Sequence, residues 1–262
     1  MATDYYSAGS LSAQTYDVVE AALSGAEAPD VAVYRRLLGA SRLDCLEVGC
    51  GTGRLTYALA EAGHRVHGMD LSDGMISICE SKRSAVPADV AGRVSLSQGD
   101  AREFTLHRTF DAVLLTFFCL NHLAPEEAWE AAFRSARRHL KPGGMVVAHV
   151  LGEGFLDQMT SPESLLRESV TVPFGPRAQT LRISVGAREI DVALGRFRQL
   201  NRFEILDPVS GEVRRSEEWL EFLWLPAASI TAAAIRAGLL PLGHECLPMR
   251  TAGRTDFHRF RL

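Results

Sequence analysis

The chain has 262 residues, of which 47% are hydrophobic and 23% charged, and its formal net charge is −4. These values are ordinary for a globular protein that buries its own core. The sequence has no long basic run of the kind that binds nucleic acid. No apolar run approaches the roughly 20 residues of a membrane span. We therefore expect neither nucleic acid nor a membrane as a partner. The N-terminus shows no signal-peptide pattern. The five cysteines are scattered without a close C-x-x-C pair, which predicts reduced thiols in a cytoplasmic protein and no metal site.

The first 150 residues alternate short apolar runs with amphipathic stretches, the pattern of βαβ units around a parallel sheet. In chain order, we expect helices over 11–25 and 29–39, a strand over 43–48, a helix over 53–62, a strand over 65–69, a helix from Ser72 to about Arg83, strands over 93–97 and 110–116, a helix over 125–140, a turn at 142–144 and a strand over 145–150.

The pattern changes after this point. Period-two alternation over residues 170–217 predicts a small antiparallel sheet exposed on one face, with turns at Gly186 and at Ser210-Gly211. A helix over 226–238 and strands over 242–247 and 256–262 follow it. The antiparallel segment is therefore expected as an insertion before the last helix.

A glycine-rich turn follows the first predicted strand, where residues 46–53 have the sequence LEVGCGTG. Glycines there let the backbone turn sharply and let a ligand approach the main chain. A dinucleotide loop would need Gly or Ala where Arg54 stands, and the acidic Glu47 would repel a pyrophosphate. The motif instead favours a ligand that carries an ammonium group close to Glu47.

Two more acids follow the next strands. Asp70 is placed to accept hydrogen bonds from two ribose hydroxyls, with Leu71 and Met75 as apolar walls for an adenine. Asp100 is placed to accept from the adenine amine, and the Ala101 N–H to donate to a ring nitrogen. All three loops follow the carboxyl ends of strands, so they should share one rim of the sheet, where ligands of open α/β sheets bind.

These motifs, together with the phrase HLKPGG at residues 139–144, resemble the class I S-adenosylmethionine-dependent methyltransferases. The resemblance covers roughly residues 40–150. It implies an α/β Rossmann-like fold with three α-β-α layers, S-adenosyl-L-methionine as cofactor and S-adenosyl-L-homocysteine as product. The cofactor-binding residues that it implies are Glu47, Gly49, Cys50, Gly51, Gly53, Arg54, Asp70, Leu71, Met75, Asp100, Ala101, Thr116 and Phe117. For Arg54, a solvated position in the first helical turn remains the alternative.

A narrower resemblance is to small-molecule and peptide N-methyltransferases of bacterial natural-product pathways. It implies a helical lid over 1–40, a cofactor-binding core over 41–152 plus 226–262, and an antiparallel insertion over 165–225 that caps the acceptor. The expected acceptor is an amine in a small molecule or peptide, and the expected assembly is a monomer or homodimer.

Methyl transfer from a sulfonium is an in-line displacement, which needs alignment and exclusion of water more than elaborate chemistry. The catalytic candidates are His122, whose ordinary pKa suits proton transfer near neutrality, and Tyr16 on the lid. Both residues have packing as their alternative role. Asn121 either orients the acceptor or holds a turn, and His149 is expected to be a buried, hydrogen-bonded histidine.

Three other functions remain open. An O-methyltransferase would act on a carboxyl or hydroxyl group, and an acidic acceptor would be favoured if the cavity were lined by Arg182, Arg188, Arg196 or Arg198. The second alternative function is that of a protein that binds the cofactor but does not catalyse methyl transfer. A nicotinamide dehydrogenase is the third, and Arg54 and Glu47 count against it.

Overall fold

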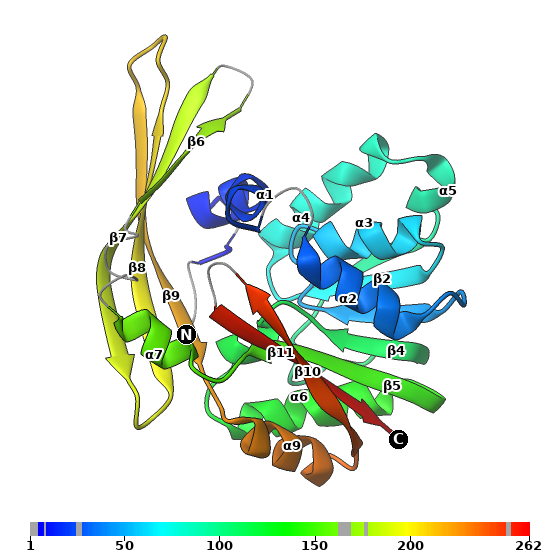
Figure 1. Ribbon diagram of the computed structural model, residues 1–262. Helices are drawn as coiled ribbons and strands as arrows, with labels where there is room; N and C mark the ends of the chain where they lie inside the picture. The colour runs from blue at the N-terminus through cyan, green and yellow to red at the C-terminus, as the bar shows by residue number, and fades with distance from the viewer. Residues whose placement is uncertain (1–4, 8, 25–27, 162–168, 176–177, 250–252) are drawn as a thin grey trace.

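A seven-stranded sheet forms the centre of the computed structural model, which describes residues 5–7, 9–24, 28–161, 169–175, 178–249 and 253–262 (Figure 1). The strand order is β10-β11-β5-β4-β1-β2-β3, and β11 runs antiparallel to both of its neighbours. The strands are β1 (Asp44–Val48), β2 (Arg65–Asp70), β3 (Val94–Gln98), β4 (Phe110–Leu115), β5 (Leu140–Leu151), β10 (Leu240–Met249) and β11 (Gly253–Arg261).

Helices cover both faces of this sheet. Val113 and Leu115 of β4 pack with α6 (Glu127–Arg138) and α9 (Ala227–Arg236), while Ala112 and Leu114 face α2 (Pro29–Leu38) and α3 (Arg54–Glu61). A strand buried on both faces needs a continuous apolar run, which is what the sequence shows here. The predicted three-layer Rossmann-like fold is confirmed. Within the described residues, no helix combines the length and apolar character needed to cross a membrane.

Short helices join these elements. Ser72 caps α4 (Asp73–Ser81) as predicted, because its hydroxyl accepts a hydrogen bond from the Met75 N–H at 3.1 Å. The remaining short helices are η1 (Lys82–Ala85), α5 (Ala88–Ala91), η2 (Cys119–His122) and α7 (Phe155–Thr160).

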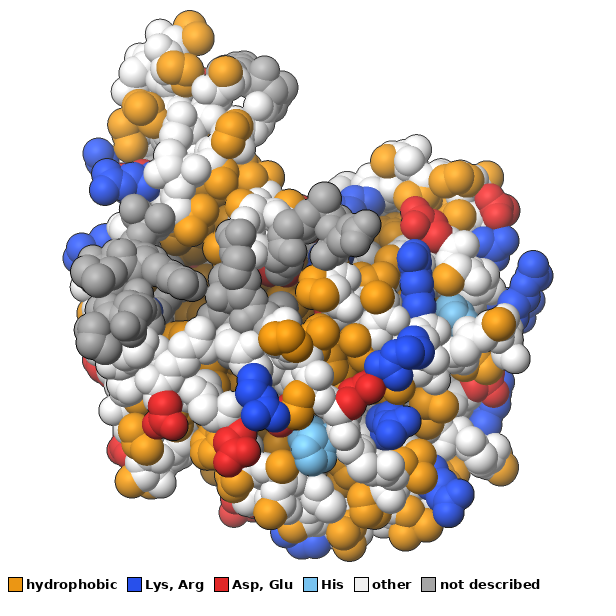
Figure 2. Space-filling view, viewed as in Figure 1, with side chains coloured by type: hydrophobic (Ala, Val, Ile, Leu, Met, Phe, Trp, Pro, Cys, Tyr) orange, Lys and Arg blue, Asp and Glu red, His pale blue; other side chains and the backbone are white. Residues whose placement is uncertain are grey.

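A separate antiparallel sheet of four strands stands beside the core, with α1 (Leu11–Ser24) between the two (Figure 1). Figure 2 shows its outer end projecting clear of the core. Its strands are β6 (Ser169–Phe174), β7 (Gln179–Asp191), β8 (Arg196–Leu206) and β9 (Val213–Leu223). One face packs Leu181, Phe203 and Ile205 against Leu11 of α1. The other carries cross-strand ion pairs such as Arg202–Glu217, so the sheet is exposed on one face as predicted.

Two predicted turns are wrong, because the glycines serve close packing inside strands. Residues 142–144 lie within β5, where a Cβ on Gly144 would lie 3.0 Å from the Asp111 carbonyl oxygen of β4. Gly186 lies at a bulge within β7, where a Cβ would lie 2.9 Å from the Arg202 side chain. Glycine inside a strand commonly marks such a bulge or close approach.

Helix α1 is fixed to both sheets. The buried Glu218 carboxylate of β9 accepts hydrogen bonds from the N–H groups of Leu11 (2.9 Å) and Ser12 (3.2 Å), which caps the helix from a distant strand. On the core side, Asp17 accepts from the Thr52 hydroxyl at 2.6 Å. The orientation of α1 therefore depends on contacts with both parts of the protein.

Replacing Glu218 by Ala should lower the free energy of unfolding by about 1–3 kcal/mol, because two buried N–H groups lose their acceptor. Urea denaturation measures the change, and the exposed Glu212, in the loop before β9, provides a matched Glu212→Ala control. Hydrogen exchange at residues 11–15 should become faster in Glu218→Ala alone. Equal effects of the two substitutions would show that the cap contributes nothing specific.

Candidate active site

A cavity of about 1160 Å³ lies between the rim of the main sheet, α1 and the inner face of the antiparallel sheet. Its volume is slightly above the usual range of about 300–1,000 Å³ for small-molecule sites, which suits two ligands side by side. All predicted cofactor-binding residues line it except Gly53, and so do His122 and Tyr16. The loops at the ends of β1, β2, β3 and β4 are brought together as expected.

The glycine-rich loop presents its main chain to this cavity. Gly49 and Gly51 have φ angles of +78° and +53°, in the left-handed region that favours glycine. A Cβ on Gly49 would lie 2.5 Å from the Cβ of Cys119, whereas one on Gly51 would meet nothing within 4 Å. Gly51 therefore leaves open space for a ligand. Gly53 is the N-cap of α3 and packs against Cys79 instead of lining the cavity, and its role toward the cofactor stays a prediction.

Asp70 connects two of the loops. Its Oδ2 accepts from the Gly51 N–H at 2.8 Å, and its Oδ1 accepts from the Ser72 N–H at 2.9 Å. Burial raises the pKa of this carboxyl, and the backbone hydrogen bonds oppose that rise. Each carboxylate oxygen has a second lone pair, so the group can hold the loops and still accept from a ligand in the cavity.

Glu47 is a carboxyl buried at the base of the cavity, only 2% exposed. The hydroxyls of Thr56 (2.5 Å) and Thr116 (3.3 Å) donate to it. Burial raises its pKa to about 8, against the opposing effects of these hydroxyls and of Arg54. An ammonium group bound beside this carboxyl would favour its ionised form, because a nearby positive charge lowers the pKa of a carboxyl.

Arg54 is a paired residue and not a solvated one. Its guanidinium donates two hydrogen bonds to Asp30, at 2.9 and 2.7 Å, and lies over the Phe117 ring at 4.9 Å from the centroid. The bidentate geometry holds the cation rigidly on the cavity wall. Sequence reasoning missed Asp30, whose only signal was an acid in the first turn of a predicted helix.

The wall assigned to adenine combines apolar and acidic groups. Leu71 is 61% exposed although it lines the cavity, and Met75 is buried beneath it. Asp100 and Ala101 are also on the wall, and both Asp100 oxygens accept from the Arg102 Nε at 3.0 Å. Arg102 lowers the pKa of Asp100, so this acid stays ionised. Its hydrogen bond to an adenine amine stays a prediction.

The opposite end of the cavity is aromatic. The Tyr6 ring lies 5.7 Å from the Tyr16 ring and 5.9 Å from the His122 ring, and His122 lies 4.7 Å from Phe222 of β9, all between centroids. Burial raises the pKa of both tyrosines well above the ordinary value, so both stay un-ionised at neutral pH. This end is formed by the N-terminal segment, the core and the antiparallel sheet together.

His122 does not titrate near neutrality, contrary to expectation. Burial lowers its pKa to about 4, and a hydrogen bond with the Glu221 backbone only partly opposes this effect. The imidazole is therefore neutral at pH 7. It can accept a hydrogen bond from a ligand in the cavity, but it is a weak base.

Two other polar residues near this end have structural roles. The Asn121 side chain donates to the Leu223 carbonyl at 2.9 Å and accepts from the Leu151 N–H at 3.1 Å, so it joins the core to β9. His149 is buried, stacks on Phe257 at 4.0 Å between centroids, and forms a hydrogen bond with Thr255, as expected.

Comparisons with known proteins agree with this geometry. The methyltransferase domain family matches residues 45–144. The chain is 32% identical over 224 residues to the dTDP-3-amino-3,4,6-trideoxy-alpha-D-glucopyranose N,N-dimethyltransferase of Streptomyces venezuelae, which covers 83% of this chain and 86% of the relative. This chain is a class I S-adenosylmethionine-dependent methyltransferase. It is also 38% identical over 173 residues, 62% of each chain, to the cypemycin N-terminal methyltransferase of a Streptomyces species.

Among solved structures, the methyltransferase is similar to Streptomyces venezuelae DesVI, with a TM-score of 0.69 and 25% identity over 94% of this chain and 97% of that one. The residues of the cavity fit S-adenosylmethionine. Gly51 leaves room for close approach, Glu47 suits the ammonium group, and Asp70 has lone pairs for hydroxyl donors.

Of the four arginines considered for an acidic acceptor, the methyltransferase places only Arg188 on the cavity wall. Arg188 donates to Gln199 and to the Met159 carbonyl. Arg182 and Arg198 belong to the ion pairs of the outer face, and Arg196 is exposed. The cavity is therefore not the basic site that a free carboxylate acceptor would favour.

Replacing Asp70 by Ala should weaken binding of S-adenosylhomocysteine by about 1–3 kcal/mol, because a charged hydrogen-bond acceptor is lost and the loops lose their connection. Calorimetric titration measures the affinity, and Asp89→Ala, at an exposed acid paired with Arg93, is the control. Unchanged binding in Asp70→Ala would remove this residue from the cofactor site.

The affinity for S-adenosylhomocysteine should rise between pH 6 and pH 8, by up to about tenfold per unit. Below pH 8 the Glu47 carboxyl is largely protonated, and binding an ammonium group requires release of that proton. Calorimetry in two buffers of different ionisation enthalpy should detect the released proton. Glu47→Gln should flatten the dependence, and the same slope in the variant would assign it to another group.

Proposed function

We propose that this methyltransferase acts on an amine nitrogen of a small molecule, and that a nucleotide-linked amino sugar is the substrate class to test first. The relative that aligns over most of the chain is named as a dimethyltransferase of such a sugar. A peptide amino terminus is the second class, because another relative is named for that activity. S-adenosylmethionine supplies the methyl group as a sulfonium, and the protein aligns the acceptor with it.

The observation that carries the proposal is the neutral, aromatic acceptor end of the cavity. His122 has a pKa of about 4, and Tyr6 and Tyr16 are un-ionised, so these groups cannot act as a strong base. A hydroxyl acceptor needs such a base, whereas a neutral amine attacks with its own lone pair. The acceptor end therefore supports N-methylation over O-methylation.

His122 is assigned to orientation of the amine. Because its ring is neutral, one nitrogen accepts a hydrogen bond from an acceptor N–H while the other is engaged by the Glu221 backbone. The amine enters after losing its proton to water. A nitrogen–carbon bond then forms as the carbon–sulfur bond breaks, and the product leaves as an ammonium ion. Tyr16 closes the pocket beside Tyr6 and excludes water.

The antiparallel sheet is assigned to acceptor recognition, as a cap over residues 165–225, and residues 1–40 to the lid. Its inner face presents Gln199 and Asn201, whose side chains form a hydrogen bond of 2.8 Å, and Asn201 also donates to the Tyr5 hydroxyl at 3.1 Å. Amides and hydroxyls on a cavity wall suit a polyhydroxylated ligand such as a sugar. Leu220 and Phe222 supply the apolar part of the same wall.

The test is a substrate panel analysed by mass spectrometry with S-adenosylmethionine as donor. It contains nucleotide-linked amino sugars, the same sugars with a hydroxyl in place of the amine, and peptides with a free amino terminus. Mass gains of one or two methyl groups on the amino sugars alone support the proposal. Equal turnover of the hydroxyl analogues would indicate an O-methyltransferase, and cofactor binding without any turnover would indicate a silent binding protein.

His122→Ala should lower kcat/KM by about 10–100-fold while affinity for S-adenosylhomocysteine changes less than about twofold, because one hydrogen bond to the acceptor is lost. His122→Gln should recover part of the activity, since an amide oxygen also accepts a hydrogen bond. A general base would not be replaced in this way. The exposed His107 gives a His107→Gln control. Normal turnover in His122→Ala would make the residue structural.

A further inference from the structure

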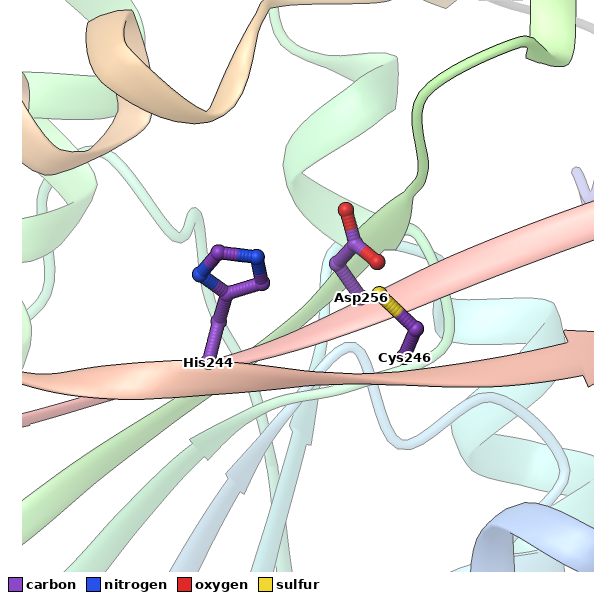
Figure 3. A group of neighbouring side chains, drawn as sticks. All are labelled: His244, Cys246 and Asp256. Carbon is purple, nitrogen blue, oxygen red and sulfur yellow. The ribbon is translucent and has the colours of Figure 1, made fainter.

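The hairpin of β10 and β11 brings together three side chains that can bind a metal ion, His244, Cys246 and Asp256 (Figure 3). One imidazole nitrogen, the sulfur and a carboxylate oxygen all lie within 4.8 Å of one another. His244 and Cys246 are two positions apart on β10 and so share a face, and Asp256 pairs with Cys246 across the ladder. The strand register therefore builds the cluster.

Asp256 is a buried carboxyl beside the Arg254 cation, and one of its two oxygens has no hydrogen-bond partner. Its side chain is 5% exposed, and its Oδ1 is buried without a hydrogen-bond partner. A buried unpaired carboxylate oxygen is unfavourable unless a cation or a water satisfies it. A small cavity of about 140 Å³, lined by His244, Arg254 and Asp256 beside the start of α9, leaves room for an ion and a water.

The ligand atoms select the metal. Calcium and magnesium take oxygen ligands, whereas a nitrogen, sulfur and oxygen set suits zinc. Tetrahedral zinc would hold these atoms about 3.5 Å apart, so side-chain shifts of about 1 Å complete the geometry. Arg254 donates a hydrogen bond to the Cys246 sulfur at 2.8 Å, which fixes the position of that side chain.

We propose that His244, Cys246 and Asp256 form a zinc site that fixes the C-terminal hairpin, with water as the fourth ligand. Cys246 and His244 are exposed, so the ion enters from solvent. His258, opposite His244 on β11, stacks on it at 4.8 Å between centroids and holds its ring in place. The proposal replaces the expectation of no metal site, which rested on cysteine spacing.

The test is titration of the full-length, reduced and metal-free protein with Co²⁺ and Zn²⁺. Co²⁺ should bind with one equivalent per chain and give the absorption of a tetrahedral site with a thiolate ligand, and Zn²⁺ should displace it. Cys246→Ser should lose the thiolate band. His244→Gln should weaken binding more than about tenfold. Zn²⁺ should also raise the thermal unfolding midpoint of the wild-type chain and leave that of Cys246→Ser unchanged.

His107→Gln, at an exposed histidine on another surface, is the matched control and should bind the metal like the wild type. Far-UV circular dichroism of each variant without metal separates loss of the site from loss of the fold. Metal binding of equal affinity in all variants would overturn the proposal. Absence of a stoichiometric site in the folded wild-type protein would overturn it as well.

Discussion

The carboxylate of Asp70 is the contact on which the organisation of the cavity depends. Through the N–H groups of Gly51 and Ser72 it sets the spacing of two loops that follow adjacent parallel strands. Ser72 in turn caps α4, and its hydroxyl donates to the Tyr6 carbonyl of the lid. The glycine loop, α4 and the N-terminal segment are thus linked through Asp70 and Ser72, although they come from separate parts of the chain.

Burial is the common cause of the unusual charge states in the cavity. It raises the pKa of Glu47 and of the lid tyrosines and lowers that of His122, so each group is held towards its neutral form. The ion pair of Arg54 with Asp30 at the cofactor end is held by two hydrogen bonds. The Arg54 cation is thereby neutralised by Asp30, and the carboxyls of Glu47 and Asp70 remain as acceptors for ligands that carry positive charge.

The elements and motifs of the core could be predicted from the sequence, because each depends on residues that lie close together in the chain. Apolar runs, the residue 46–53 motif and the acids after β2 and β3 are readable within single loops. The wrong or missing predictions concern residues whose contacts come from segments far away in the sequence. Gly144 and Gly186 resemble turn glycines until the strands beside them are known. Asp30 and Glu218 carried no motif, since their partners are 24 and more than 200 positions away in the chain. The pKa of His122 was misjudged for the same reason, since burial is a tertiary property.

The aromatic end of the cavity joins the core to the antiparallel sheet. His122 belongs to the core, yet its backbone hydrogen-bond partner, Glu221, and its ring neighbour, Phe222, belong to β9. Asn121, the preceding residue, is tied to the same strand through the Leu223 carbonyl. A change in β9 that altered the fit of an acceptor would therefore also alter the position and protonation of the histidine. On the proposed function, acceptor choice and alignment of the nucleophile would therefore depend on one shared contact and not on two separable sites.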